Sequence, residues 1–398
     1  MTGTVSGPGL SPADVIEAAR ELAPGLASRA AATDASGAFP AEDFAAIRSA
    51  GLLGLLVPER LGGSGGGFAD YAEVAMALAA GNGSTALVYN MHASVTGTLA
   101  LTSDEVARAL GVPETFFAMR DRVLRDAVDG ALYGVAMSER GVGSRLSQLA
   151  TRYSRTEDGF HLKGSKTFCS GAGNVNGYVV AARSAETGAV SQFLVDAEVP
   201  GITVEETWDS LGMRATSSHD VHLDVDVPAD ALLGGIEGLG VLVGQAMPQW
   251  LVASYAGVYV GVAQAAVDAA APQITERGLE RLPAVRARVG RADAAVSAAR
   301  EVVRQAARRV DAAPGDPETN RWVWRAKLLA GQTAMDVAAS MLEACGTSAT
   351  RRGNDLERLY RDARCGSLQP ATSDVCADWL GLAALGLDPE NQAEVPRW

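Results

Sequence analysis

Residues 221–225 read VHLDV, and this alternation of apolar and polar side chains predicts a β-strand with one buried face. Residues 178–181 (YVVA) and 192–195 (QFLV) also have strand composition. Residues 159–165 (GFHLKGS) predict a strand edged by turn residues. The sequence from about residue 133 to about residue 233 is therefore predicted to form a β-domain.

The sequence on both sides of this β-domain is predicted to be helical. A first helix should begin at residues 11–14 (SPAD), with a serine cap, a proline in the first turn and an acid near the positive end of the helix dipole. Residues 283–313 predict a long helix that the turn at 314–317 (PGDP) ends, and residues 318–345 resume it. The fold class is therefore α+β, with helical residues 1–124, a β-domain at 125–236 and a helical bundle at 237–398.

Composition restricts the classes of function. The 398 residues are 47% hydrophobic and 20% charged, which is typical of a globular protein. The net charge of -13 argues against a nucleic-acid partner. We expect no membrane span, because no apolar run reaches ~18 residues, and no secretory signal at the N-terminus. The four cysteines and four histidines have no metal-ligand spacing, so we expect a cytoplasmic enzyme without a metal.

Residues 141–144 (GVGS) are the most suggestive local motif. Two glycines and a serine can present backbone N–H groups and a hydroxyl to a phosphate. The glycine run at residues 62–67 lacks the Lys-Ser/Thr of a phosphate loop and reads as a turn between helices. These features by themselves indicate an enzyme-sized α+β protein and no specific reaction.

Five segments, taken together and in this order, resemble the acyl-CoA dehydrogenase superfamily. Residues 51–65 (GLLGLLVPERLGGSG) resemble the helix-loop signature near its N-terminus. The other four are residues 136–144 (AMSERGVGS), similar to (T/S)EPGAGSD; 164–171 (GSKTFCSG), similar to G-x-K-x-W-I-T-N; 211–218 (LGMRATSS), similar to LGMRGTxS; and 356–364 (LERLYRDAR), similar to ERxYRDAR.

The resemblance implies an N-terminal helical domain, a central β-barrel domain and a C-terminal four-helix bundle, with a flavin (FAD, or alternatively FMN) between the last two. It places Ser138 at the pyrimidine edge of the flavin ring, Ser144 at the phosphate and Ser170 at the N5 side. Phe168 replaces a tryptophan that packs on the ring, so the apolar surface survives. It also places Gly143, Arg277 and Thr372 among the cofactor-binding residues.

The sequence departs from the family pattern at the catalytic base. The family removes the substrate's α-proton with a glutamate, and Pro370 stands at that position here. The family's other location for the base falls near residues 250–251, which are Trp and Leu. His92 is the candidate replacement, because an imidazole suits proton transfer and the family packs this helix against the substrate cavity.

The segments that reach the adenosine half of FAD are also altered. Arg277 lies in a shortened segment that lacks the family's Phe-Gly, and Glu343 stands where the family has a glutamine. A carboxylate facing a pyrophosphate is repulsive unless it is paired. Weaker FAD binding, or FMN in its place, is the implication.

Several charged residues near the expected site are predicted to be structural. Glu139 and Asp374 are acids that we expect to be structural or solvated. Arg361, Asp362 and Arg364 are expected to form an ion network that caps a helix.

Three functions fit this resemblance. The first is oxidation of an acyl thioester, or a similar activated carbonyl, by a flavin oxidoreductase with a non-standard base. The second is a flavin monooxygenase of the same fold, which receives reduced FMN from a partner reductase, uses O2 and needs no such base. The third is a non-catalytic relative. The resemblance further implies a homodimer or homotetramer, for which residues 321–342 carry enough apolar side chains to form an interface.

Overall fold

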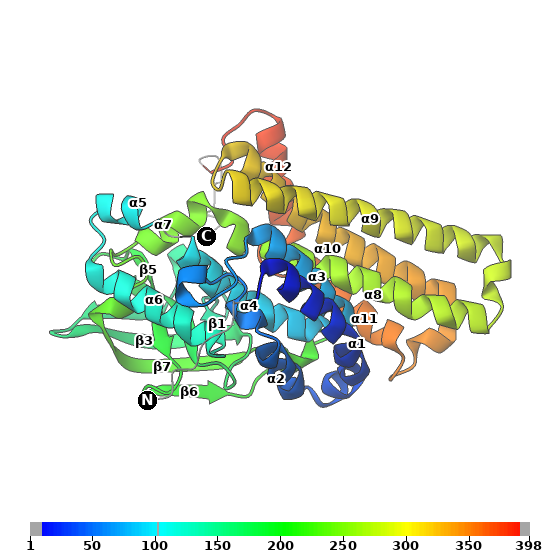
Figure 1. Cartoon of the computed structure of the whole chain (residues 1–398), viewed down its shortest axis with the longest axis horizontal. Coiled ribbons are helices and arrows are strands. Elements are labelled where there is room, and N and C mark those ends of the chain that lie inside the picture. Colours follow the sequence, from blue (N-terminus) through cyan, green and yellow to red (C-terminus); the bar gives the residue numbers. More distant parts are fainter. Residues whose placement is uncertain (1–9, 102, 391–398) are drawn as a thin grey trace.

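The computed structural model describes residues 10–101 and 103–390, and it contains a sheet between two helical regions. The first helical region comprises α1 (Pro12–Ser36), α2 (Ala41–Ser49), α3 (Phe68–Gly81), α4 (Gly83–Ala100), α5 (Asp104–Ala109) and α6 (Glu114–Val128). The order helices, sheet, helices is confirmed (Figure 1).

The predicted starts and ends of the long helices are confirmed. Ser11 caps α1 in a capping box, in which its hydroxyl accepts from the N–H of Asp14 and the Asp14 carboxylate accepts from the N–H of Ser11. The second helical region comprises α7 (Leu239–Ala246), α8 (Ser254–Glu276), α9 (Pro283–Ala312), α10 (Pro317–Cys345), α11 (Asp355–Arg364) and α12 (Ser373–Ala384). α8, α9, α10 and α11 pack as the expected four-helix bundle.

The central region forms one seven-stranded sheet. Its strands are β1 (Tyr133–Ala136), β2 (Arg152–Arg155), β3 (Gly159–Cys169), β4 (Gly177–Ser184), β5 (Val190–Asp196), β6 (Ile202–Glu205) and β7 (His219–Pro228). β4 pairs with β5 on one side and with β1 and β2 on the other, and the sheet continues through β3 and β7 to β6. Within the described ranges β5 and β6 are edge strands, so the sheet is open where the resemblance implied a closed barrel.

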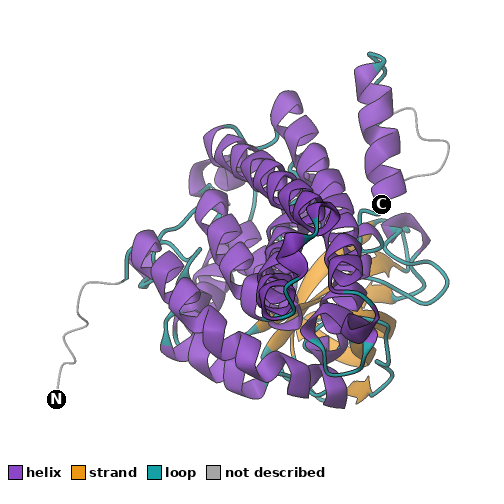
Figure 2. Cartoon of the chain, turned by 90° about the vertical axis from the view of Figure 1, so that its right-hand side faces the viewer, coloured by secondary structure: helices purple, strands orange, loops and turns teal. Residues whose placement is uncertain are grey.

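The sheet and the helices share one continuous apolar core. Figure 2 shows the strands gathered in the lower right part of the view, behind the helices. α4 is buried along almost its whole length, because it lies between β1 and α8. Residues 248–276, which include α8, are apolar and long enough to cross a membrane, contrary to our expectation, but 78% of their apolar window is buried inside the protein.

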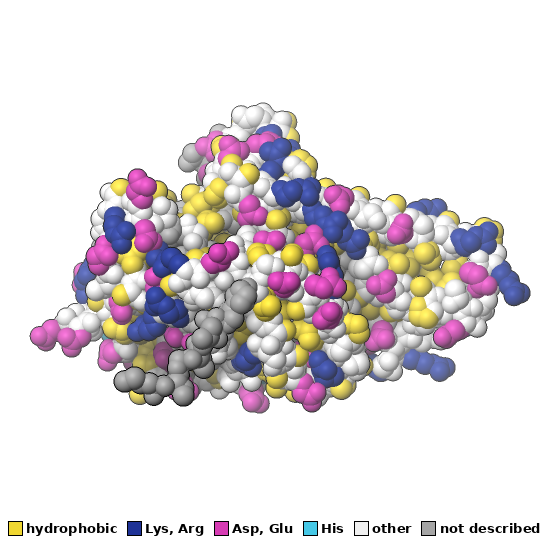
Figure 3. Space-filling model, viewed as in Figure 1, with side chains coloured by type: hydrophobic (Ala, Val, Ile, Leu, Met, Phe, Trp, Pro, Cys, Tyr) yellow, Lys and Arg dark blue, Asp and Glu magenta, His cyan; other side chains and the backbone are white. Residues whose placement is uncertain are grey.

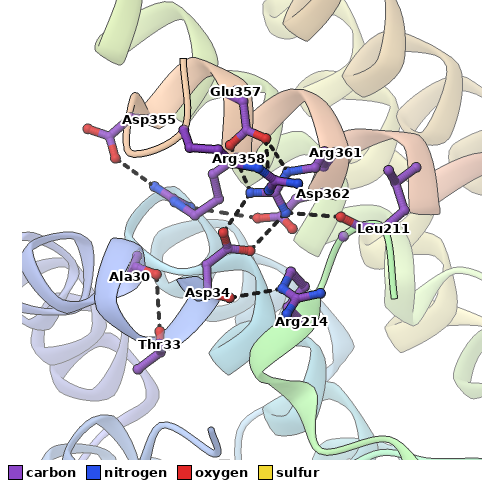
Figure 4. Close-up of polar contacts among 12 residues, drawn as sticks. Ala30, Thr33, Asp34, Leu211, Arg214, Asp355, Glu357, Arg358, Arg361 and Asp362 are labelled. Atoms are coloured by element: carbon purple, nitrogen blue, oxygen red, sulfur yellow. Dashed lines mark hydrogen bonds and ion pairs between the residues drawn. The ribbon is translucent and has the colours of Figure 1, made fainter. Parts of the chain in front are cut away.

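A buried ion network joins the three regions (Figure 4). Arg361 on α11 donates two hydrogen bonds to the carboxylate of Asp34 on α1, at 2.6 and 2.9 Å, and a third to the carbonyl of Leu211 in the sheet region. The Asp362 carboxylate accepts from the N–H of Met213 at 2.6 Å. The predicted ion network is present, and Arg364 stays local at Ser367, but Arg361 and Asp362 do not cap the helix, because their partners lie about 150 and 327 positions away and tie the regions together.

Part of the apolar surface of residues 321–342 is buried inside the chain. Trp324 is 1% exposed and stacks on Trp379 of α12 at 5.3 Å between ring centroids. The ring of Trp322 is covered by the guanidinium groups of Arg309 and Arg325. The prediction that this segment supplies a subunit interface stays a prediction: its two tryptophan rings have partners within the chain, whereas Leu329 is 37% exposed.

Candidate active site

A hollow of ≈660 Å³ opens at the end of the sheet. Three segments line it: the loop at residues 139–145 except Ser144, the end of β3 at Thr167 and Phe168, and residues 207–209 with Ser218 and Asp220. Of the predicted cofactor-binding residues, Gly143 and Phe168 line it directly. Ser138 adjoins it, because its carbonyl accepts from the N–H of Thr167 at 2.9 Å.

Phe168 presents its ring to this hollow because β3 is irregular there. The pairing of β3 with β7 shifts between Lys166 and Cys169, and Phe168 adopts a left-handed φ of 58°. A bulge of this kind turns a side chain away from its regular direction. The Phe168 ring is 59% exposed and touches solvent except where Trp208 lies edge-on to it, at 6.0 Å between centroids. An exposed aromatic ring in a strained conformation indicates a surface that a ligand covers.

Three hydroxyl groups form a chain behind Phe168. The Ser170 hydroxyl lies 2.9 Å from that of Ser218, which lies 2.7 Å from the hydroxyl of Thr216. Thr216 donates to the carbonyl of Met213. Ser218 lines the hollow, so Ser170 is connected to it through Ser218.

A buried ion pair supports the loop at residues 139–145. The Lys166 ammonium lies 2.8 Å from the Glu139 carboxylate, which also accepts from the backbone N–H groups of Ala150 and Thr151. Burial alone would raise the pKa of Glu139, but the hydrogen bonds from Lys166 and Thr151 hold it below its usual value. The prediction that Glu139 is structural agrees with this arrangement, in which its carboxylate ties the start of the loop to the backbone at residues 150–151.

Two arginines of the loop face the hollow, and the sequence reasoning missed both. Arg140 is paired with Asp220 at 2.8 Å, and Asp220 also accepts from the hydroxyl of Thr167. Arg145 donates from Nε to the carbonyl of Val142 at 3.2 Å. The sequence did contain a signal for both arginines, because the family motif has proline where this chain has Arg140 and aspartate where it has Arg145. Trp208 was missed because nothing in the sequence brings it to Phe168.

Comparison with known proteins identifies the framework that carries this hollow. Residues 14–110, 134–225 and 250–378 match the N-terminal, middle and C-terminal domains of acyl-CoA dehydrogenase. L-evernosamine nitrososynthase of a Micromonospora species is 34% identical, and the alignment covers 95% of this chain and 91% of the relative. The chain belongs to the acyl-CoA dehydrogenase superfamily.

Other members of the superfamily are similar along nearly the whole chain. The putative acyl-CoA dehydrogenase YdbM of Bacillus subtilis is 30% identical over 89% of this chain and 92% of its own. The solved structure of KijD3 in complex with FMN and dTDP-3-amino-2,3,6-trideoxy-4-keto-3-methyl-D-glucose has a TM-score of 0.81 and 29% identity, covering 98% of this chain and 97% of that chain. This acyl-CoA dehydrogenase superfamily member is accordingly a flavin-dependent oxidoreductase, and both FAD and FMN fit the family.

The superfamily's base position holds no carboxylate in this chain. Pro370 follows a turn that is bound by Lys327 of α10. The buried Lys327 ammonium donates to the carbonyl of Gly366 at 2.9 Å and to that of Gln369 at 3.2 Å. Tyr259 of α8 donates to the side-chain carbonyl of Gln369 at 2.7 Å. These hydrogen bonds fix the turn, and residues 365–372 contain no carboxylate and no histidine.

His92 is buried in the core of this superfamily member and not in the hollow. It is 1% exposed, its Nε2 lies 2.9 Å from the carbonyl of Leu53, and its Nδ1 accepts from the N–H of Tyr133 at 3.3 Å. Burial lowers the pKa of His92 to about 4. A neutral imidazole with both nitrogens occupied favours a structural role over the proton transfer that we expected.

The remaining predicted cofactor residues lie outside the hollow of this chain. Thr372 caps α12, where its hydroxyl accepts from the N–H of Val375. Arg277, at the C-terminal end of α8, donates to the carbonyl of Cys345 and the hydroxyl of Ser348. Across residues 10–101 and 103–390, no group of three His, Cys, Asp or Glu side chains is placed to hold a metal ion.

Proposed function

We propose that the protein is a flavin-dependent monooxygenase that oxidises the amine nitrogen of a nucleotide-linked amino sugar. The observation that carries the proposal is the absence of a proton-accepting group at Pro370 and Leu251, in a chain whose hollow fits a flavin. Removal of an α-proton needs such a group, whereas attack of an amine nitrogen on activated oxygen needs a free lone pair. The nitrososynthase relative and the ligands of KijD3 supply the substrate class.

The residues present fit a flavin in the hollow. Phe168 would pack on the ring, and Ser138 and the Ser170–Ser218 hydroxyl pair would serve its polar edge. Gly143 has a positive φ, with open space where a side chain would start, so the loop can approach a phosphate through its backbone beside Ser144. Thr372 and, from a neighbouring subunit, Arg277 complete the proposed set. A bound flavin supplies two electrons at a time and, when reduced, activates O2.

The overall reaction balances with two oxygenations. In the first, the amine, O2 and a reduced flavin give a hydroxylamine, water and oxidised flavin. In the second, the hydroxylamine, O2 and a second reduced flavin give the nitroso compound, two waters and oxidised flavin. We propose that a separate reductase supplies the reduced flavin, because each of the two oxygenations consumes one reduced flavin. We also propose a cytoplasmic homo-oligomer.

The acyl-thioester reaction is the second candidate, and the similarity to YdbM favours it. This reaction would require a proton acceptor from outside residues 365–372 and 250–251. His92 does not suit that role, since both of its ring nitrogens already have partners.

One experiment separates the two candidates. The flavin-loaded protein is mixed with a flavin reductase, NADH, 18O2 and an amino-sugar nucleotide, and the product is analysed by mass spectrometry. We expect incorporation of 18O at nitrogen. In parallel, the oxidised protein is mixed anaerobically with acyl-CoAs of several chain lengths. Bleaching of the flavin in that second arm, with no labelled product in the first, would establish the dehydrogenase instead.

A further inference from the structure

The loop at residues 139–145 brings one uncompensated positive charge to the hollow. Arg140 is paired with Asp220, Asp209 with Arg214, and the Glu139 carboxylate with Lys166. Arg145 donates only to a backbone carbonyl, and no carboxylate is paired with its guanidinium in the described part of the chain. The protein carries a net charge of -13, with acidic side chains spread over the face in Figure 3, and Arg145 places an unpaired positive charge at this hollow.

The backbone next to Arg145 leaves open space for a ligand. Gly141 and Gly143 both have positive φ values, of 78° and 67°, and a side chain at either would meet nothing within 4 Å. The carbonyl of Glu139 accepts from Val142 and Gly143, which curls the loop so that Ser144 and Arg145 follow its tip. Because the N–H groups of Val142 and Gly143 are engaged in this turn, an anion here would be bound by the Arg145 guanidinium together with the Ser144 hydroxyl.

The charge at this position is opposite to that of the family motif. The motif that residues 136–144 resemble continues with aspartate after its serine, whereas this chain has Arg145 after Ser144. Replacing an acid by an arginine changes the local charge by about two units. A phosphomonoester carries nearly two negative charges at neutral pH, whereas each phosphate of a diphosphate ester carries about one.

We propose that Arg145 determines cofactor specificity by binding a terminal phosphomonoester, so that the hollow takes FMN in preference to FAD. This inference rests on the proposed flavin site but not on the proposed reaction. The polar groups that the resemblance assigns to the adenosine half of FAD are already engaged within the chain. Glu343 is paired with Arg288 at 2.7 Å, and Arg277 with Cys345 and Ser348. These groups are therefore not free to receive an adenosine group, and FMN needs neither of them.

The test measures binding to the flavin-free protein, with no turnover. Riboflavin, FMN and FAD are titrated by quenching of flavin fluorescence, for the parent protein and for Arg145→Gln, Arg145→Lys and Arg145→Asp. Loss of one charge-assisted contact weakens binding by roughly 10- to 100-fold. We expect Arg145→Gln to weaken FMN by that factor, to weaken FAD less and to leave riboflavin unchanged. Arg145→Lys should retain most of the FMN affinity, and Arg145→Asp should lose more than Arg145→Gln.

The matched control is Arg140→Gln, which removes the same charge from the same loop but from a residue paired with Asp220. Unchanged riboflavin binding also shows that each variant keeps its folded site. Equal weakening of FMN by Arg140→Gln and Arg145→Gln would overturn the proposal, because the overall charge of the loop would then be responsible. Tighter binding of FAD than of FMN by the parent protein would also overturn it.

A second arm distinguishes the flavin phosphate from a phosphate of the substrate. Thymidine diphosphate is titrated into the FMN-loaded parent and Arg145→Gln proteins by calorimetry. We expect the same affinity for both. Weaker thymidine diphosphate binding in Arg145→Gln, with FMN binding unchanged, would assign Arg145 to the substrate and reject the proposed role. Failure of the oxygenation assay above would leave this binding result standing, so the two proposals fail separately.

Discussion

Two clusters of buried charged groups, one at the junction of the three regions and one beneath the hollow, have different roles. At the junction of the three regions, Arg361 binds Asp34, Glu357 and the carbonyl of Leu211. Beneath the hollow, Lys166 and Glu139 form one pair that holds a single loop. The first network joins segments that are hundreds of residues apart, whereas the second only shapes a surface. Buried charge therefore serves architecture in one place and the proposed cofactor site in the other.

Removing the charge at the junction should have the largest effect. In Arg361→Met, the Asp34 and Glu357 carboxylates lose their buried partner, so we expect the free energy of unfolding to fall by about 5 kcal/mol. Urea unfolding measures this loss. Arg352→Met is the control, because Arg352 also pairs with Glu357 but is 77% exposed, and an exposed pair contributes about 1 kcal/mol or less. Equal losses of unfolding free energy in Arg361→Met and Arg352→Met would show that burial of Arg361 does not strengthen the junction.

Breaking the Lys166–Glu139 pair should lower the free energy of unfolding less than Arg361→Met does, but it should also weaken riboflavin binding. We expect Lys166→Met to lower the free energy of unfolding by about 3 kcal/mol and to weaken riboflavin, because the loop that Glu139 fixes loses its shape. The double variant Lys166→Met/Glu139→Gln should recover part of the stability, since no unpaired charge then remains. If the double variant recovers stability and neither variant changes the affinity for riboflavin, the Lys166–Glu139 pair does not support the flavin site.

The acid response of the fold should depend on His92. Burial lowers the pKa of His92 to about 4 from 6.5, so the folded state holds the ring neutral and the unfolded state binds the proton more readily. This contribution to stability is complete above pH 6.5 and is lost as the pH falls toward 4, by up to about 3 kcal/mol. Unfolding curves at several pH values should show this loss in the parent protein and a smaller one in His92→Asn. An identical pH dependence in both would remove the structural assignment of His92.

The smallest expected effect is a gain of stability at the hollow. In the flavin-free protein, Phe168→Gly should raise the free energy of unfolding by about 1 kcal/mol, because glycine adopts a φ of 58° without strain. The same change should weaken riboflavin, since the ring surface is lost. Phe168→Leu is the comparison that keeps an apolar side chain and the strain. A stability loss in Phe168→Gly would show that the ring is part of the core.

Local chemistry made the main elements predictable from the sequence. The alternation at residues 221–225 lies in β7, and the turn at 314–317 separates α9 from α10 as predicted. β1, β2 and β6 were missed because each has four residues, too few to show a period. The predicted first boundary at residue 124 falls inside α6, which continues to Val128.

The candidate site was predictable only where the family motifs run through it. Ser138, Gly143 and Phe168 lie at or beside the hollow because the motifs place them there. Trp208 contacts Phe168, and Asp220 contacts Thr167. These partners are far apart in the sequence, so no local pattern predicts the contacts. His92 was misjudged because burial depends on α4 lying between β1 and α8, which a helical pattern alone does not reveal.

The attachment of α11 also limits how the molecule can move. One helix is fastened to α1 through Asp34 and to the sheet region through Leu211 and Met213, and its last residue leads directly into the turn that ends at Pro370. Hinged opening between the regions would have to separate all of these contacts at once. Flavin and substrate should therefore enter and leave by displacement of side chains and loops at the rim, while the scaffold stays still.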